Sequence, residues 1–293
     1  MRRQRGGGDS RREALNYRHH FHAGNFADVQ KHAILLQALT GLTADPTQLD
    51  VIDTHAGAGV YDLRGDMAQR SRESEAGVAR LLSDPAAPTA LAPLKARIAS
   101  LNGGGPLRIY PGSPWLIAKA LRAGDRYRGC ELRPDDHATL AQCLADMERT
   151  SGATLRAVMT DGFALVDRLE RAGERTLLLI DPPYERGDDY ARIVETLGKA
   201  HAARPGLAAL VWAPIKDLET FDALLRALEG LPFQQGWAAE VRLRPLRDPM
   251  RLNGSALIGL GLPVPPGTDA ICAWAAASAG EAGALGRVTP LFV

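Results

Sequence analysis

The sequence contains no apolar run of about 18 residues, the shortest length from which a membrane-spanning helix is built. Its first residues are polar and rich in arginine and glycine, whereas a secretory leader needs a central apolar segment. Neither a membrane span nor a leader is therefore predicted, and we expect a cytoplasmic protein.

Cysteine is scarce as well. The three cysteines, Cys130, Cys143 and Cys272, lie far apart, and no C-x-x-C pair is present. A disulfide framework needs an even set of cysteines, and a zinc knuckle needs closely spaced thiols. We therefore expect reduced thiols that serve only in packing.

An excess of charge of one sign is also missing. With 35 lysines and arginines against 34 aspartates and glutamates, the net charge is +1, so the molecule as a whole does not attract polyanions. Basic residues are concentrated in two clusters, each equally compatible with a solvated surface. They are Arg2, Arg3, Arg5, Arg11, Arg12 and Arg18 in the first cluster, and Arg242, Arg244, Arg247 and Arg251 in the second. Because the first contains Gly6-Gly7-Gly8, we predict a disordered basic arm over residues 1–14.

The composition is otherwise that of an ordinary globular protein, with 45% hydrophobic residues. From Val51 onward, short apolar runs alternate with amphipathic stretches, which is typical of a parallel α/β sheet. The predicted strands are 49–53, 127–132, 155–160, 176–181, 207–213, 236–244 and 255–262. The predicted helices are Pro114–Arg122, Asp135–Arg149, Phe163–Arg171, Tyr190–Ala203 and Leu218–Leu228. Only a turn joins the last two strands, so we expect a seven-stranded, mostly parallel sheet that ends in an antiparallel hairpin.

One stretch interrupts this alternation. After the glycine turn at 57–59, the next helix of the pattern begins only at about residue 114. The chain between them includes a helical segment at Glu75–Leu82 and an Ala/Pro-rich part at 84–99. We therefore predict one α/β domain over residues 15–293, interrupted by a helical insertion at about 62–106.

The glycine turn, Asp53-Thr-His-Ala-Gly57-Ala-Gly59, directly follows an apolar strand. Glycines at such a turn let the backbone approach a ligand closely, as in nucleotide-binding α/β proteins. The third glycine of the dinucleotide fingerprint is missing, because Val60-Tyr61-Asp62 follows instead. The turn therefore favours a nucleotide-like cofactor that has no pyrophosphate.

Acidic residues end the next two strands. Glu131 follows Tyr-Arg-Gly-Cys, and Asp161 lies in Thr-Asp-Gly-Phe163. Each alone is more often a helix N-cap, but ligands of open α/β sheets bind along the carboxyl edge, where both would meet Asp53. The pattern favours S-adenosylmethionine, with Glu131 on the ribose hydroxyls. Asp161 would accept a hydrogen bond from the adenine amine, with Phe163 against the ring.

The most specific motif is Asp181-Pro182-Pro183-Tyr184, which ends the apolar strand Leu177–Ile180. Two prolines make a rigid turn that holds Asp181 and Tyr184 at the sheet edge. The Asp181 carboxylate and the Pro182 carbonyl would orient the hydrogens of an exocyclic adenine amine and stabilise the charge that develops on its nitrogen. Tyr184 would stack on a base removed from its helix. We therefore predict Asp181, Pro182 and Tyr184 as catalytic residues.

Together these motifs resemble the RlmJ family of bacterial 23S ribosomal RNA adenine-N6 methyltransferases. The resemblance runs from about Leu15 to Leu262 and implies methylation of adenine 2030 by a Rossmann-like, S-adenosylmethionine-dependent domain with a small helical insertion. It is carried by Tyr17-Arg-His-His-Phe-His-Ala-Gly-Asn-Phe-Ala-Asp-Val-Gln-Lys31-His32, Asp53-Thr-His-Ala-Gly-Ala-Gly, Tyr110-Pro-Gly-Ser-Pro114, Glu131-Leu-Arg-Pro, Asp161-Gly-Phe and Asp181-Pro-Pro-Tyr.

The resemblance also implies roles for particular residues. Tyr17 would lie on the target-base side of the site. Lys31, at the end of a helical stretch, would bind the methionine carboxylate through a charge-assisted contact. Besides Gly57 of the glycine turn, the implied cofactor contacts are Lys31, His32, His55, Ser113, Glu131, Asp161 and Gly162.

A metal site is not expected, although His19, His20, His22 and His32 lie close together in the sequence. No nearby cysteine or carboxylate set completes a metal shell, and neutral histidine serves equally well as a hydrogen-bonding group. The expected partner is 23S ribosomal RNA, either naked or in an early assembly intermediate, bound by a monomer.

Two other functions remain open at this point. DNA adenine-N6 methyltransferases use the same tetrapeptide, although they commonly carry a separate target-reading domain, for which the insertion is small. A non-catalytic RNA-binding or assembly factor that keeps the fold is the second alternative. Nothing structural would then require Asp181, Tyr184 and the glycine turn together.

Overall fold

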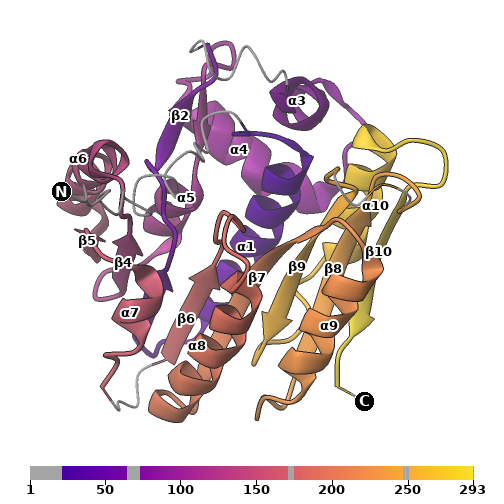
Figure 1. The fold of residues 1–293 in the computed structure, drawn as a ribbon. Helices are drawn as coiled ribbons and strands as arrows, with labels where there is room; N and C mark the ends of the chain where they lie inside the picture. The colour runs from indigo at the N-terminus through magenta and orange to yellow at the C-terminus, as the bar shows by residue number, and fades with distance from the viewer. Residues whose placement is uncertain (1–21, 65–72, 171–174, 247, 249–250, 293) are drawn as a thin grey trace, which may run out of the picture.

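The computed structural model describes residues 22–64, 73–170, 175–246, 248 and 251–292. Its centre is an eight-stranded sheet in the order β10-β8-β9-β7-β6-β1-β4-β5, with helices on both faces (Figure 1). Among the described residues, no helix is long and apolar enough to cross a membrane. The arm predicted at residues 1–14 lies outside the described residues.

The strands of this sheet are β1 Leu49–Asp53, β4 Arg126–Cys130, β5 Thr154–Val158, β6 Arg175–Ile180, β7 Leu207–Ile215, β8 Gly236–Arg242, β9 Gly254–Leu260 and β10 Leu285–Pro290. The helices around it are α1 Phe26–Ala44, α5 Ser113–Ala120, α6 Pro134–Ser151, α7 Gly162–Val166, α8 Asp189–Ala203, α9 Leu218–Glu229 and α10 Thr268–Ala279. The seven predicted strands thus form within about two residues of their expected positions.

Strands β5, β4, β1, β6 and β7 are parallel to one another. Successive residues face opposite layers: Leu177 packs in the core that α1, α5 and α6 share, and Leu178 in the core of α7, α8 and α9. This burial on both faces is why β6 is an uninterrupted apolar run. From β1 the chain continues to β4 and β5 on one side of β1, and then to β6 and β7 on its other side. The loops after β1 and β6 therefore leave in opposite directions and open a crevice between them.

The other end of the sheet is antiparallel. β9 pairs with β7 and β8, which confirms the predicted terminal hairpin. The expectation of seven strands is corrected by an eighth, β10, which pairs with β8. No residue of β10 is fully buried, so its sequence lacks the apolar run that marks the central strands.

Helix α1 lies between the sheet and the helices of the insertion, and nearly every residue from Phe26 to Leu39 is buried. Asn25 caps it by accepting a hydrogen bond from the Asp28 backbone N–H. The sequence placed Lys31 at the end of a helical stretch, which is wrong, since Lys31 lies in the second turn of α1. A helix that is buried on all sides has no polar stripe, so its start and end leave little periodic signal.

The segment between β1 and α5 adds a second small sheet and, among its described residues, four short helices. β2 Val60–Asp62 pairs antiparallel with β3 Ile109–Pro111. Between these strands lie the π-helix η3 Glu75–Ala79, α3 Arg80–Ser83, the 3-10 helix η4 Thr89–Leu91 and α4 Ala92–Leu101. They form one layer against α1, above the carboxyl edge of the sheet (Figure 1).

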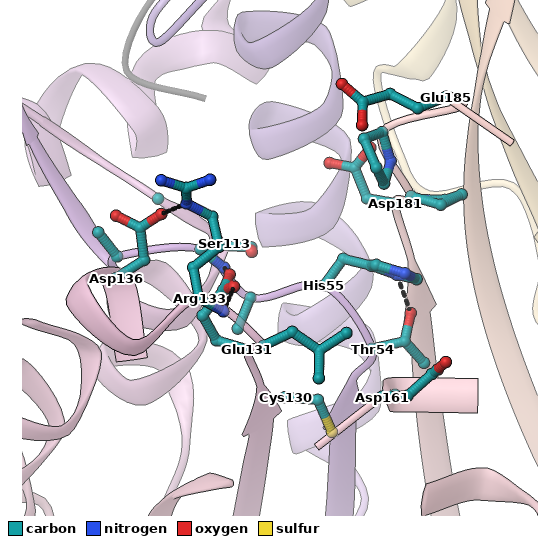
Figure 2. Close-up of a pocket in the computed structure, with 18 of the residues that line it drawn as sticks. Thr54, His55, Ser113, Cys130, Glu131, Arg133, Asp136, Asp161, Asp181 and Glu185 are labelled. Atoms are coloured by element: carbon teal, nitrogen blue, oxygen red, sulfur yellow. Dashed lines mark hydrogen bonds and ion pairs between the residues drawn. The ribbon is translucent and has the colours of Figure 1, made fainter. Parts of the chain in front are cut away.

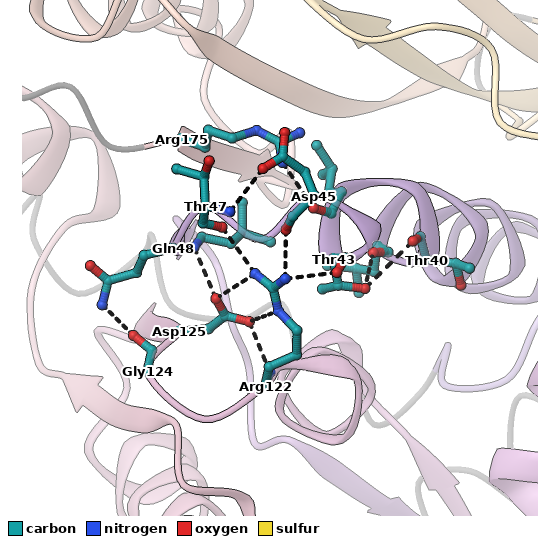
Figure 3. Close-up of polar contacts among 12 residues, drawn as sticks. Thr40, Thr43, Asp45, Thr47, Gln48, Arg122, Gly124, Asp125 and Arg175 are labelled. Carbon is teal, nitrogen blue, oxygen red and sulfur yellow. Dashed lines mark hydrogen bonds and ion pairs between the residues drawn. The ribbon is translucent and has the colours of Figure 1, made fainter.

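At the opposite edge of the sheet, Arg122 and Asp125 tie α1 and α5 to β1 (Figure 3). The Arg122 guanidinium donates to the carbonyl oxygens of Thr43 at 2.8 Å and Thr47 at 3.0 Å. Asp125 accepts the backbone N–H of Leu49 at 2.9 Å and three hydrogen bonds from Arg122. The pair thereby satisfies carbonyl groups that the end of α1 leaves unpaired.

Candidate active site

A cavity of about 420 Å³ opens at the carboxyl edge of the sheet, where the loops after β1, β4, β5 and β6 converge (Figure 2). Ten of the residues that the sequence analysis singled out line this cavity. They are Lys31, His32, His55, Gly57, Ser113, Glu131, Asp161, Gly162, Asp181 and Pro182. The fold thus gathers in one place residues from segments that are distant in the sequence.

The glycine turn and Glu131 hold each other in place. Gly57 adopts a left-handed φ of +66°, and a Cβ atom there would lie 2.2 Å from the Tyr61 hydroxyl. Its N–H donates to Oε2 of Glu131 at 3.1 Å, while Oε1 accepts the Arg133 N–H at 2.7 Å. Burial raises the pKa of Glu131 despite these donors. The carboxylate still has lone-pair capacity to accept a hydrogen bond from a hydroxyl group in the cavity.

Asp53 supports the cavity without lining it. Its buried carboxylate accepts hydrogen bonds from the Ser113 hydroxyl at 2.7 Å and from the Tyr127 hydroxyl at 3.3 Å. Burial raises the pKa of Asp53 to about 6, against the opposing effect of the Ser113 hydrogen bond. The contact fixes Ser113, the first residue of α5, at the wall of the cavity.

Asp161 caps the short helix α7 and faces the cavity (Figure 2). Its Oδ1 accepts the Phe163 N–H at 2.9 Å, and its Oδ2 accepts a hydrogen bond from Arg192 at 2.7 Å. Burial opposes ionisation, but the Arg192 contact outweighs it and lowers the pKa of Asp161. At Gly162, a Cβ atom would lie 2.1 Å from the Thr54 carbonyl oxygen, so only glycine fits between the two loops.

Lys31 places a buried ammonium group between two carboxylates. Its Nζ lies 2.5 Å from Oδ2 of Asp181 and 3.0 Å from Oδ1 of Asp28. Burial alone would lower the pKa of Lys31, but the two carboxylates outweigh it and raise this pKa. The ammonium is therefore a fixed positive charge at the wall of the cavity, next to the motif after β6.

The two lining histidines have different environments. His32 is buried and hydrogen-bonds through Nδ1 to the Tyr110 hydroxyl at 2.9 Å. His55 hydrogen-bonds through Nδ1 to the Thr54 hydroxyl at 2.8 Å. Burial lowers the pKa of His55 to about 4, so it is uncharged near neutral pH. His55 therefore adds no positive charge that would repel a cationic ligand.

The two aromatic residues expected to contact bases are turned away from the cavity. Tyr184 has a φ of +52°, its hydroxyl donates to the Trp212 carbonyl, and its ring packs against Tyr190 with centroids 5.0 Å apart. Phe163 is 4% exposed. Neither Tyr184 nor Phe163 is among the residues that line the cavity. Pro182, by contrast, lines it beside Asp181.

Sequence reasoning missed several charged residues of the lining. Arg133, Asp136, Glu185, Arg186 and Arg192 all line the cavity. Arg133 pairs with Asp136 at 3.0 Å at the start of α6 (Figure 2). Charged residues at helix starts and in loops are common on surfaces, so the sequence carries no functional signal for them.

The remaining histidines and cysteines form no metal cluster in the described ranges, where no group of three His, Cys, Asp or Glu side chains is suitably arranged. His22 instead pairs with Glu73 at 2.9 Å. Tyr17, His19 and His20 lie outside the described residues. The three cysteines are free thiols, of which Cys143 alone is partly exposed.

Two of the four arginines in the second cluster are paired with acids. Arg242 contacts the buried Glu240 at 2.6 Å, and Arg244 contacts Glu281 at 3.0 Å. Arg247 lies outside the described residues. This cluster therefore offers less uncompensated positive charge than its sequence suggests.

The strand order, with β9 running antiparallel between β7 and β8, and the cavity where strand addition reverses are those of a Rossmann-like methyltransferase. Within that class, the family model of ribosomal RNA large subunit methyltransferase D, RlmJ, matches residues 46–286. The chain belongs to this family, as the resemblance predicted.

Individual relatives support this membership. The chain is 33% identical over 251 residues to ribosomal RNA large subunit methyltransferase J of Escherichia coli, covering 85% of this chain and 88% of that protein. It is 32% identical to the protein of that name from Haemophilus influenzae, again covering 85% of this chain and 88% of that protein. The crystal structure of protein LPL1258 from Legionella pneumophila superposes with a TM-score of 0.82 at 26% identity, covering 92% of this chain and 98% of that one.

Proposed function

We propose that the protein transfers the methyl group of S-adenosylmethionine to N6 of one adenine in 23S ribosomal RNA. The observation that carries this proposal is that Asp181 and Pro182 share one cavity with Glu131 and Asp161. The names of the two bacterial relatives support large-subunit ribosomal RNA as the substrate, and the family resemblance implies adenine 2030.

The cavity residues fit S-adenosylmethionine chemically. Glu131 offers acceptors for the ribose hydroxyls, and Asp161 offers one for the adenine amine. Lys31 supplies the positive charge that the methionine carboxylate requires. Several carboxylates around the cavity favour the positive charge of a sulfonium. A volume of about 420 Å³ suits a ligand of this size.

Asp181 would act on the target amine. Its carboxylate and the Pro182 carbonyl would accept hydrogen bonds from the amine, which favours a pyramidal nitrogen. The nitrogen lone pair would then bond to the methyl carbon as the sulfur–methyl bond breaks, which leaves S-adenosylhomocysteine. As the new bond forms, positive charge develops on nitrogen, and Asp181 stabilises it and accepts the proton. Lys31 fixes the orientation of this carboxylate through its contact with Oδ2. The bound cofactor supplies an activated methyl group.

Two predicted substrate contacts remain proposals. Tyr184 would stack on the target base, which requires its hydroxyl to leave the Trp212 carbonyl and its ring to turn toward Asp181. Tyr17 would reach the base from the N-terminal segment. Substituting each by phenylalanine and by alanine distinguishes a ring contact from a hydroxyl contact, because only the alanine variants remove the ring.

The substrate is tested by incubating the protein with methyl-labelled cofactor and either protein-free 23S RNA or duplex DNA of the same sequence. Label that appears as N6-methyladenine in the RNA alone supports the proposal. Label in the DNA alone would instead assign the protein to the DNA adenine methyltransferases. The 2′-hydroxyl and the folded loops of RNA are the features that separate the two polymers.

The non-catalytic alternative predicts RNA binding without transfer. If the protein binds S-adenosylmethionine and 23S RNA and still transfers no label to either polymer or to an early assembly intermediate, the catalytic proposal is wrong. Mapping the modified position in ribosomal RNA from cells with and without the protein then tests adenine 2030 directly.

A further inference from the structure

None of the roles proposed above involves Arg192. It lies in the first turn of α8, and its guanidinium reaches across to the loop after β5. One nitrogen donates to Oδ2 of Asp161 at 2.7 Å, and the guanidinium carbon lies 4.4 Å from the centre of the Phe163 ring. Arg192 also lines the cavity.

Phe163 is covered by this arrangement. The rings of His55 and Phe163 make an edge-to-face contact with centroids 5.0 Å apart. The Arg192 guanidinium lies over the Phe163 ring. Phe163 therefore presents no ring face to the cavity, which it does not line. Close to Asp161, Arg192 and His55 both line the cavity and both carry a flat group. A guanidinium plane stacks well on aromatic rings.

The same contact fixes the direction of the Asp161 carboxylate. Oδ1 accepts the Phe163 N–H and Oδ2 accepts a hydrogen bond from Arg192, so both oxygens are held. With both oxygens held, the remaining lone pairs point in fixed directions. A hydrogen-bond donor on a purine is then accepted in only a few orientations.

We propose that Arg192 is a cofactor-binding residue that stacks on the purine ring of the cofactor and positions Asp161 to accept the exocyclic amine. This inference rests on the proposed function, since it assigns the adenine end of the same cavity. The stacking adds a cation–π contribution to any neutral purine. The positioning of Asp161 adds affinity only for purines that carry an amine.

A purely structural ion pair is the alternative. Lys199 provides the comparison, because it lies two turns further along α8 and pairs with Asp167 at 3.0 Å and Glu195 at 2.8 Å. Lys199 does not line the cavity. Lys199→Ala therefore removes a charge and its ion pairs from the same helix without touching the proposed site.

The test measures the Kd of two ligands by calorimetry with full-length protein. The ligands are S-adenosylhomocysteine and its analogue with hydrogen in place of the exocyclic amine. Arg192→Met keeps the length of the side chain and removes both the charge and the planar surface. Arg192→Lys keeps the charge beside Asp161 and removes only the planar surface.

We expect Arg192→Met to raise the Kd of S-adenosylhomocysteine about tenfold, and that of the analogue by less, so that the preference for the amine shrinks. Arg192→Lys should weaken both ligands equally and keep the preference. Lys199→Ala should leave both values within about twofold of the wild type. Thermal unfolding of each variant shows that it is folded.

The inference is overturned if both Arg192 variants bind the two ligands as Lys199→Ala does, while the wild type binds them well. That result leaves the proposed function standing. If the wild type itself binds neither ligand, the proposed function and this inference fail together.

Discussion

The ammonium nitrogen of Lys31 lies 2.5 Å from Oδ2 of Asp181, although the two residues belong to α1 and to the loop after β6. Lys31 is 5% exposed and also contacts Asp28. The buried charge thus links the N-terminal helix to the motif that we propose to be catalytic. Three charges in one small volume make this link sensitive to the loss of any one of them.

Asp181→Ala should lower the rate of methyl transfer on the order of a hundredfold or more, because an acceptor that acts mainly in the transition state is lost. Cofactor binding should stay nearly intact. Single-turnover transfer of labelled methyl to 23S RNA and the Kd of S-adenosylhomocysteine measure the two effects. Asp188→Asn is the control, since this exposed carboxylate in the same loop pairs only with Arg186 among the described contacts. Full turnover by Asp181→Ala would refute the catalytic role.

Lys31→Met should destabilise the fold by about 3–5 kcal/mol, because the buried Asp28 and the partly buried Asp181 lose the cation that they share. Adding Asp28→Asn should recover part of this loss, since one of the two charges is then removed. Urea unfolding of the two single variants and the double variant measures the coupling. Strictly additive effects would mean that the two residues do not interact. Transfer activity should stay low in the double variant.

The stability contributions of Asp53 and His55 should oppose each other on acidification. The pKa of Asp53 rises on folding from 3.8 to about 6, so its contribution to stability is full below 3.8 and is lost as pH rises through 6. The pKa of His55 falls from 6.5 to about 4, so its contribution is full above 6.5 and is lost as pH falls through 4. Between pH 4 and 6.5 the two changes partly cancel.

Single substitutions should separate these two contributions. Compared with the wild type, Asp53→Asn should lose about 1–3 kcal/mol more stability between pH 7 and pH 4, because only the His55 effect remains. His55→Gln should lose less stability than the wild type between pH 7 and pH 4, because only the Asp53 effect remains. Urea denaturation at a series of pH values gives both profiles. Parallel profiles for all three proteins would show that neither group titrates differently on folding.

Asp125→Ala should lower the free energy of unfolding by about 2 kcal/mol or more, because the N–H groups of Leu49 and Arg122 lose their acceptor. Its side chain is 2% exposed, so water does not replace the lost hydrogen bonds. Asp146→Ala is the matched control, since it removes an exposed aspartate that pairs with Arg149. Equal effects of the two substitutions would mean that the contacts of Asp125 add nothing.

Much of the fold could be predicted from the sequence because its central strands are buried on both faces. Leu177–Ile180 is an apolar run that fits no solvent-exposed element, and β6 forms there. α1 and β10 could not be predicted in this way. Nearly all of α1 up to Leu39 is buried, and no residue of β10 is fully buried. Neither element therefore shows the alternation of apolar and polar residues from which helices and strands are predicted.

The sequence by itself determined which residues end the parallel strands, and therefore that Glu131, Asp161 and Asp181 share one edge of the sheet. The physical reason is that the carboxyl ends of parallel strands must lie on the same side. Only the tertiary structure decided that Lys31 pairs with Asp181 and that Arg192 covers Phe163. These contacts join helices to loops that are distant in the chain, and their geometry depends on how the helices pack, which no local pattern encodes.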